Sequence, residues 1–237
     1  MRIRNAPSLD PRQQTITWQA ASILLGYPDE DLLARLPLLR DATRELPPHV
    51  REPLRACINH LAPVPLTDLE ADYVDTFDNR RRHNLFLTYF AHGDTRKRGM
   101  ALLRFKQTYL HSGFQLTDTE LPDHLCVVLE YAATIDAERG RQLILDHRAG
   151  LELLRISLAE AGSRWAGAIE AVSASLPPLQ GGEWEAVQRL AAEGPPDEEV
   201  GLTPYATPGF DPGPSTPDGP TLLPMPSFPA PSTRGVR

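Results

Sequence analysis

The sequence has little of what defines several protein classes. Its two cysteines in 237 residues, Cys57 and Cys126, provide neither a disulfide framework nor a zinc motif. The longest unbroken apolar run, Leu125–Leu129, is far shorter than the ~20 residues that a membrane-spanning helix needs. The first 14 residues contain no apolar stretch typical of a signal peptide. We therefore expect a soluble protein of the cytoplasm.

Motifs of catalysis and metal binding are missing as well. The chain has no phosphate-binding loop, dinucleotide fingerprint, nucleophile elbow or His-Glu-x-x-His pair. None of its seven histidines lies three or four positions from another, the spacing that places two ligands on one helix face. The two cysteines lie in apolar stretches, which favours small buried side chains. We therefore expect no metal site and no cofactor.

Proline is abundant but unevenly distributed. Twelve of the 24 prolines lie in the last 43 residues, which have almost no apolar periodicity. Such a segment buries too little surface to offset the entropy of ordering. The sequence therefore predicts a flexible N-terminus over 1–12, one domain over 13–194 and a disordered Pro/Gly-rich tail over 195–237.

Helical periodicity dominates the predicted domain. No alternating strand pattern is convincing, although 85–90 fits either a strand or a buried helix. A segment after Pro28 also reads as helical, and Pro37 is expected to end it early. The fold class is all-α, a single-domain bundle of about seven to nine helices. The other predicted helices cover 13–27, 48–61, 67–78, 94–112, 122–136, 141–161, 163–176 and 182–193.

Local signals in the sequence predict where some of these helices begin and which side of each is buried. Thr67–Glu70 fits a capping box, and Asp94 is a predicted N-cap. The helix at 122–136 is apolar nearly all round, which is typical of a central, buried helix. Two core stripes are predicted, one comprising Ile16, Ala20, Ile23, Leu24 and Tyr27, the other Leu69, Tyr73 and Phe77.

The net charge of −7 hides a strong internal polarity. Residues 67–78 contain five acids and no base, whereas 79–106 contain eight Lys or Arg and a single acid, Asp94. An acidic protein with one concentrated basic stretch favours a local binding surface over a nucleic-acid footprint. Between the basic runs lies the apolar, aromatic segment 83–90. It fits either plain core or a groove for an amphipathic peptide helix.

One carboxylate interrupts the most apolar helix. Glu130 fits either a buried catalytic acid or an ion pair with an arginine, and the ion pair is the favoured interpretation.

Three motifs resemble a known family. They are Tyr73–Asp78 followed by Arg80-Arg81-Arg82, then His92-Gly-Asp-Thr-Arg-Lys-Arg-Gly-Met-Ala-Leu102, then Glu120-Leu-Pro-Asp-His-Leu125 continuing through Tyr131. In this order they resemble the delta-subunit (NarJ-type) assembly chaperones of respiratory nitrate reductase, which are related to the maturation chaperones of other molybdoenzymes. The resemblance covers about 17–176. Cys126 departs from it, since a proline or another small residue is expected there.

The resemblance implies an all-α chaperone that is neither an enzyme nor a subunit of the final complex. It would bind the apo catalytic alpha subunit of nitrate reductase through that subunit's N-terminal segment. It would hold this subunit competent for insertion of the molybdenum cofactor before membrane docking. Molybdenum-cofactor biosynthesis proteins are further implied partners, whereas nucleic acid and membrane insertion are not expected.

Matching the motifs assigns the client-peptide site to particular residues. Alternatives remain open: a chaperone for a different molybdoenzyme, a metal-dependent all-α hydrolase using His92, Asp94 and Glu130, and a nucleic-acid-binding helical domain. The residues carried over are Tyr73, Phe77, Arg80, Arg81, Arg82, His92, Asp94, Arg96, Lys97, Arg98, Arg104, Glu130 and Tyr131.

Overall fold

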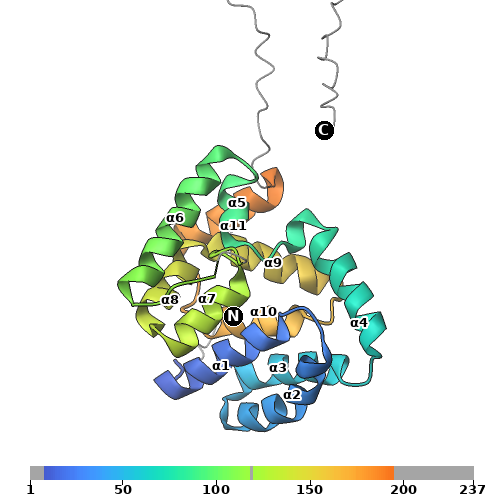
Figure 1. Ribbon diagram of the computed structural model, residues 1–237. Helices are drawn as coiled ribbons and strands as arrows, with labels where there is room; N and C mark the ends of the chain where they lie inside the picture. The colour runs from blue at the N-terminus through green and yellow to red at the C-terminus, as the bar shows by residue number, and fades with distance from the viewer. Residues whose placement is uncertain (1–7, 118–119, 195–237) are drawn as a thin grey trace, which may run out of the picture. The chain divides into compact units, whose positions relative to one another are not determined.

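The computed structural model describes residues 8–117 and 120–194, and the predicted tail lies outside this part. Across the described ranges the chain forms eleven α-helices, and the only strand-like pairing is an isolated bridge between Phe86 and His124 (Figure 1). The predicted all-α class is confirmed, although the expected number of helices was too low. The helices are α1 Pro11–Leu24, α2 Glu30–Ala42, α3 Pro48–Leu61, α4 Leu66–Tyr73, α5 Leu87–His92, α6 Arg96–His111, α7 Leu125–Thr134, α8 Ala137–Asp146, α9 Arg148–Glu160, α10 Ala166–Ala174 and α11 Gly181–Glu193.

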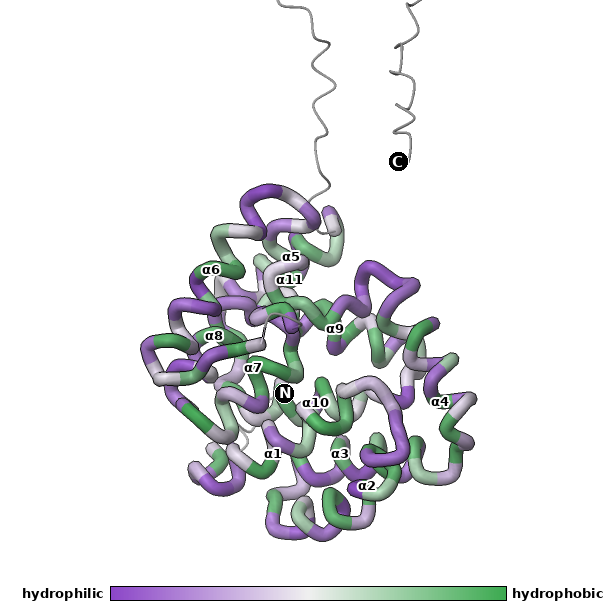
Figure 2. The backbone as a smooth tube through the Cα atoms, viewed as in Figure 1, coloured by the Kyte–Doolittle hydropathy of each residue, from purple (hydrophilic) through white to green (hydrophobic). Residues whose placement is uncertain are grey.

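The core forms where α1, α3, α7 and α10 meet. Trp18 on α1 and Trp165 before α10 are 1% and 0% exposed. A Cβ on Gly167 would lie 2.2 Å from the Pro53 carbonyl oxygen, so the absence of a side chain lets α10 approach α3 closely. The predicted burial of α7 is confirmed, because Leu125, Val128 and Leu129 are inaccessible. Figure 2 shows that hydrophobic residues predominate in α7. Within the described ranges, no helix has both the length and the apolar character to cross a membrane.

The two cysteines are free thiols in apolar surroundings. Cys57 is buried and Cys126 is partly buried, which confirms their interpretation as small packing side chains. Burial raises the pKa of each thiol to about 12.

Two predicted helix boundaries were wrong. Pro37 lies inside α2 and does not end it, and it occupies an exposed position of that helix. The single helix predicted over 141–161 is instead α8 and α9, which meet at His147. The break lets α8 pack on α7 while α9 packs on α10 and α11.

Two predicted caps were also wrong. The carbonyl of Pro65 accepts from the amides of Asp68 and Leu69, so α4 begins before Thr67 and no capping box forms. The N-cap of α6 is Thr95, and Asp94 pairs with Arg98 instead.

The predicted stripe of α1 is confirmed except at its last member. Ala20 and Leu24 are buried, and Ile16 and Ile23 pack against the core. Tyr27 lies beyond the end of α1 and is 53% exposed.

Candidate functional site

The predicted aromatic residues belong to the core. Tyr73 and Phe77 are 7% and 6% exposed, and both rings contact Trp165 at centroid distances of 5.4 and 5.5 Å. The Tyr73 hydroxyl donates to the Leu25 carbonyl at 2.9 Å, and burial raises its pKa. The predicted core stripe of Leu69, Tyr73 and Phe77, on α4 and the turn that follows it, is confirmed. Contact of the two rings with a client stays a prediction.

The arginines at 80–82 follow a π-helical turn, Val74–Asp78. Arg80 pairs with Asp75 at 3.2 Å on the surface, and Arg81 is exposed. Arg82 donates to the carbonyl of Ala191 at 3.2 Å. The third arginine therefore connects this segment to α11.

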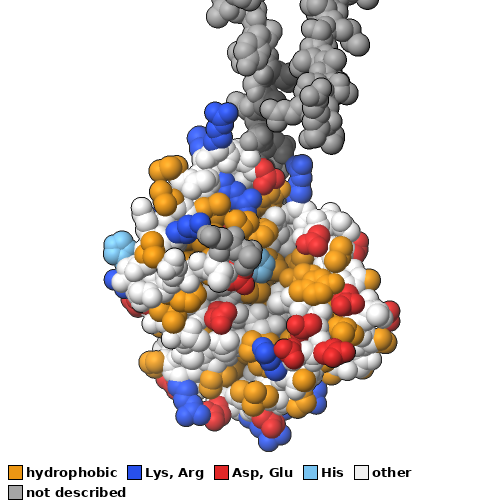
Figure 3. All heavy atoms as spheres, in the orientation of Figure 1, with side chains coloured by type: hydrophobic (Ala, Val, Ile, Leu, Met, Phe, Trp, Pro, Cys, Tyr) orange, Lys and Arg blue, Asp and Glu red, His pale blue; other side chains and the backbone are white. Residues whose placement is uncertain are grey.

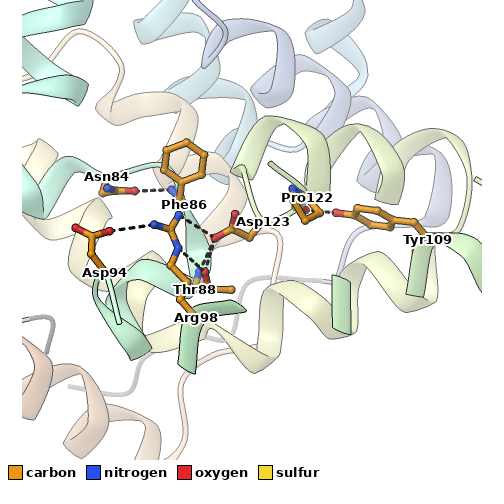
Figure 4. A network of polar contacts seen from close by, with 8 residues as sticks. All are labelled: Asn84, Phe86, Thr88, Asp94, Arg98, Tyr109, Pro122 and Asp123. Carbon is orange, nitrogen blue, oxygen red and sulfur yellow. Dashed lines mark hydrogen bonds and ion pairs between the residues drawn. The ribbon is translucent and has the colours of Figure 1, made fainter. Parts of the chain in front are cut away.

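A polar network joins the second and third sequence motifs (Figure 4). Arg98 points inward from α6, where its Nε donates to the Thr88 hydroxyl at 3.2 Å. The same hydroxyl donates to Oδ2 of Asp123, and an Arg98 Nη2 lies 3.7 Å from that oxygen. Asp94 pairs with the Arg98 Nη1 at 3.1 Å, and the Arg98 guanidinium stacks over the Phe86 ring. Of the predicted basic residues at 96–98, only Arg98 therefore enters the interior.

Asp123 provides an N-cap to α5 from a distant part of the chain. Its carbonyl accepts from the Leu87 amide at 3.0 Å, and its carboxylate accepts from the Thr88 amide at 3.2 Å. These are two of the orphan donors at a helix start. Sequence reasoning missed this role. A signal existed, since an acid lies between Pro122 and His124 directly before the most apolar helix.

The remaining predicted residues are dispersed. Arg96 and Lys97 are exposed on the outer side of α6, and Arg104 pairs with Asp146 at 2.7 Å. His92 is partly buried at the end of α5. The thirteen predicted residues thus do not converge on one surface.

The two predicted residues of α7 differ from each other. Glu130 is exposed and forms no ion pair within the described ranges, so both interpretations of a buried or paired carboxylate were wrong. The next residue, Tyr131, is 1% exposed, and its hydroxyl bonds to that of Ser112 at 2.7 Å. Across those ranges His, Cys, Asp and Glu form no group of three that could hold a metal, so His92, Asp94 and Glu130 do not form one.

An apolar hollow of about 340 Å³ lies between α5, the α8–α9 junction and α11; we call it the α5–α11 groove. The predicted segment 83–90 contributes one wall through Leu87 and Phe90, whereas the other walls come from segments that sequence reasoning did not assign. A Cβ on Gly150 would lie 2.7 Å from the Phe90 side chain, so the glycine lets α5 lie against α9. Other lining residues are Ala91, Ala149, Ala186 and Leu190, with Asp146, His147, Arg189 and Glu193.

The charged groups of the groove come from two places, Asp146 and His147 at the end of α8 and Arg189 and Glu193 on α11. Asp146 is held by Arg104 and by Gln142, whose amide donates at 2.7 Å. Burial lowers the pKa of His147, which opposes the upward influence of the Leu143 carbonyl and of Asp146. The neutral imidazole therefore adds little charge to an apolar wall. Such an arrangement suits binding of an amphipathic segment.

Comparison with known proteins agrees with this picture of a helical binding protein. The family model for the nitrate reductase delta subunit matches residues 43–171. The chain therefore belongs to the nitrate reductase delta subunit family.

Several curated relatives share this region. The chain is 34% identical over 169 residues to the probable nitrate reductase molybdenum cofactor assembly chaperone NarJ of Bacillus subtilis, covering 71% of this chain and 92% of that protein. It is 32% identical over 148 residues to NarJ of Escherichia coli K12, covering 61% and 63%. Nitrate reductase-like protein NarX of Mycobacterium tuberculosis H37Rv is 38% identical over 161 residues, covering 66% of this chain. The match spans only about a quarter of NarX (24%).

Proposed function

We propose that this chain is a system-specific assembly chaperone of a respiratory nitrate reductase. It binds the apo catalytic alpha subunit through that subunit's N-terminal segment and keeps it competent for molybdenum cofactor insertion before membrane docking. The observation that carries this proposal is the family match over 43–171, supported by relatives named as molybdenum cofactor assembly chaperones.

The α5–α11 groove is the proposed docking place for the client segment. Its floor is formed by apolar side chains from three helices, including Leu87, Phe90 and Leu190, while Arg189 and Glu193 lie on its α11 side. Apolar anchors supply affinity, and a charged rim fixes the register of an amphipathic helix. An occupant with an apolar stripe and mixed charge matches this lining.

A chaperone of this kind needs no catalytic residue. It shifts the client between open and closed states only by its differential binding free energy. When the free chaperone is present at a thousand times its dissociation constant for one state of the client, that state is stabilised by about 4 kcal/mol. Burial of a few apolar anchors in the groove is sufficient to supply this free energy.

Two of the predicted arginines act on the groove indirectly. Arg82 donates to Ala191 next to the lining residue Leu190, and Arg104 holds the lining residue Asp146. We assign both to positioning of the groove walls. Direct client contacts of Arg96 and Lys97 remain a prediction.

A synthetic peptide from the N-terminus of the alpha subunit tests the groove. Ala149→Trp fills the hollow, and we expect at least tenfold weaker binding by calorimetry, with the helix content unchanged. Ala159→Trp is a matched control, because it makes the same change on the exposed side of the same helix. Equal affinity of the two variants would remove the groove from the site.

Capture from nitrate-respiring cells tests the function itself. The full-length chain is expected to recover the alpha subunit without its molybdenum cofactor. Recovery of the cofactor-loaded subunit alone, or of none, would overturn the proposal. Recovery of a different molybdoenzyme would assign the chain to another client.

A further inference from the structure

The helix α6 is cationic along its whole length. It contains five Lys or Arg and no Asp or Glu, in a chain whose net charge is −7. Arg98 points inward to Asp123, and Arg104 pairs with Asp146. The other three, Arg96, Lys97 and Lys106, are exposed and form no ion pair within the described ranges.

The same outer side of α6 exposes a row of large apolar side chains. Met100, Leu103 and Leu110 are 71%, 45% and 60% exposed. Their spacing of three and seven residues places them on one side of the helix. On the helical wheel Lys106 lies on one edge of this row and Lys97 with Arg104 on the other. Figure 3 shows hydrophobic side chains along the outer edge of α6, with Lys and Arg at its N-terminal end.

A hollow of about 250 Å³ adjoins this face, between α6 and α8. It is lined by Arg104, Thr108 and His111 from α6 and by Arg139, Gln142, Leu143 and Asp146 from α8. Arg104 and Gln142 both bond to Asp146, and Arg139 pairs with Asp136. The charged groups on this side of α6 are therefore paired with one another, which leaves the outer face with Arg96, Lys97 and Lys106 as its unpaired cations within the described ranges.

We propose that the outer face of α6 adsorbs to an anionic lipid surface. Met100, Leu103 and Leu110 enter the interface, and Arg96, Lys97 and Lys106 meet the headgroups. An apolar row with cations on both edges is the pattern of interfacial helices. This binding adds to the proposed chaperone function and involves no client.

The observations favour a lipid surface over an acidic protein partner. A stable protein interface buries roughly 800 Å² on each partner around an apolar centre. Three exposed apolar side chains on one helix offer a much smaller apolar area than such an interface buries. Lipid adsorption instead needs few apolar anchors, and each cation near the surface multiplies the partition coefficient about fivefold.

Sedimentation of the full-length protein with lipid vesicles tests the proposal. We expect binding to phosphatidylglycerol/phosphatidylcholine vesicles and at least tenfold weaker binding to pure phosphatidylcholine. The double variant R96Q/K97Q is expected to lower the partition coefficient about 25-fold, because two cations are removed. Leu110→Gln is expected to lower it several-fold with the charge unchanged.

Matched controls lie on and just after α2. The variant R35Q/R44Q removes the same charge from exposed positions, and Leu38→Gln changes a leucine that is 68% exposed. Both are expected to bind vesicles within twofold of the unaltered protein. Equal losses in these controls, or equal binding to neutral vesicles, would overturn the proposal.

Two further arms separate lipid from other anions. Inorganic phosphate at constant ionic strength is expected to leave vesicle binding within twofold, and displacement by it would show that the cations of this face bind free phosphate instead of a lipid surface. If R96Q/K97Q weakened binding of the client peptide or of poly-glutamate but not of vesicles, the face would bind an acidic polypeptide and the lipid proposal would be wrong. Since the vesicle assay contains no client, its failure leaves the chaperone proposal unaffected.

Discussion

Two carboxylates that are almost fully buried, Glu152 and Asp123, are held in different ways. Both oxygens of Glu152 have partners: Arg148 at 2.8 Å and Ser173 at 2.5 Å on one, and Arg155 at 2.7 Å on the other. The carboxylate of Asp123 has all its hydrogen bonds on Oδ2, whereas its Oδ1 is buried without a hydrogen-bond partner in the described part of the chain. Its arginine, Arg98, is only within ion-pair distance at 3.7 Å.

The difference follows from what each carboxylate connects. Glu152 joins α9 to α10, two neighbours in the core, and both of its carboxylate oxygens are bonded, although Nε and Nη1 of Arg148 are buried without a hydrogen-bond partner in the described part of the chain. Asp123 instead caps α5, a helix of only six residues that forms one wall of the groove. The start of α5 thus depends on a carboxylate that is bonded through one oxygen only. We therefore expect α5 to be the wall that adjusts when the groove is filled.

The largest expected effect is on the Glu152 network. Glu152→Ala leaves Arg148 buried and without its carboxylate, so we expect a loss of about 3–5 kcal/mol in the free energy of unfolding. Glu45→Ala, which breaks the exposed pair with Arg12, is the control and is expected to cost less than about 1 kcal/mol. Urea unfolding monitored by circular dichroism measures both. A loss below 1 kcal/mol for Glu152→Ala would contradict the contrast between the two networks.

A smaller effect is expected at the cap of α5. Asp123→Asn keeps an oxygen for the Thr88 amide but removes the charge beside Arg98, and we expect a loss of about 1–3 kcal/mol. The client peptide is also expected to bind more weakly, because α5 loses its fixed start. Arg98→Met added to Asp123→Asn then costs less than Arg98→Met alone, since the charge it would leave unpaired is gone. Strictly additive losses would show that the two residues are not coupled.

The helical class and most helix positions follow from local pattern. The segments 48–61 and 182–193 were predicted to within one residue, because prolines and a glycine pair mark their ends. The α8–α9 break was not predicted because tertiary packing decides it, since the halves on either side of His147 pack on different partners. Pro37 was expected to end α2 but lies at an exposed position inside that helix.

The site was less predictable than the fold. Arg96, Lys97 and Arg98 are consecutive, yet one points inward and two outward, because Arg98 shares the buried side of α6 with Phe105 and Tyr109. The groove combines residues separated by about 100 positions, such as Phe90 and Leu190. No local spacing encodes such a meeting, whereas the apolar character of the wall at 83–90 was visible in the sequence.

A glycine between the two networks sharpens their comparison. Gly150 lies between Arg148 and Glu152 on α9 and touches Phe90 on α5. Gly150→Ala places a Cβ against the Phe90 side chain, and we expect about 1–2 kcal/mol of destabilisation and a several-fold change in client affinity. Gly99→Ala on α6 has open space and is expected to stabilise by about 0.5–1 kcal/mol. If both substitutions stabilised the protein, the close α5–α9 contact would be wrong.

The smallest expected effect concerns pH and His147, which lies next to Arg148 and lines the groove. Burial lowers its pKa, reinforced by His92 and opposed by the Leu143 carbonyl, Asp146 and Asp123. The unfolded state then binds a proton more readily than the folded state. The contribution of His147 to stability is therefore complete above pH ~6.5 and falls as the pH is lowered, by at most about 1.4 kcal/mol per pH unit.

His83 and His124 share this direction of pKa shift, so His147→Gln is expected to flatten the pH dependence between pH 7 and 5 only in part. The pKa of the Asp136 carboxylate is lowered chiefly by the hydrogen bond from the Arg139 amide, so its titration lies at more acidic pH and does not overlap with that of the histidines. Urea midpoints at several pH values measure the slope, with the exposed His60→Gln as control. Because protonated His147 would lie against Leu87 and Phe90, client affinity should weaken over the same pH range, and a pH-independent affinity would separate His147 from the groove.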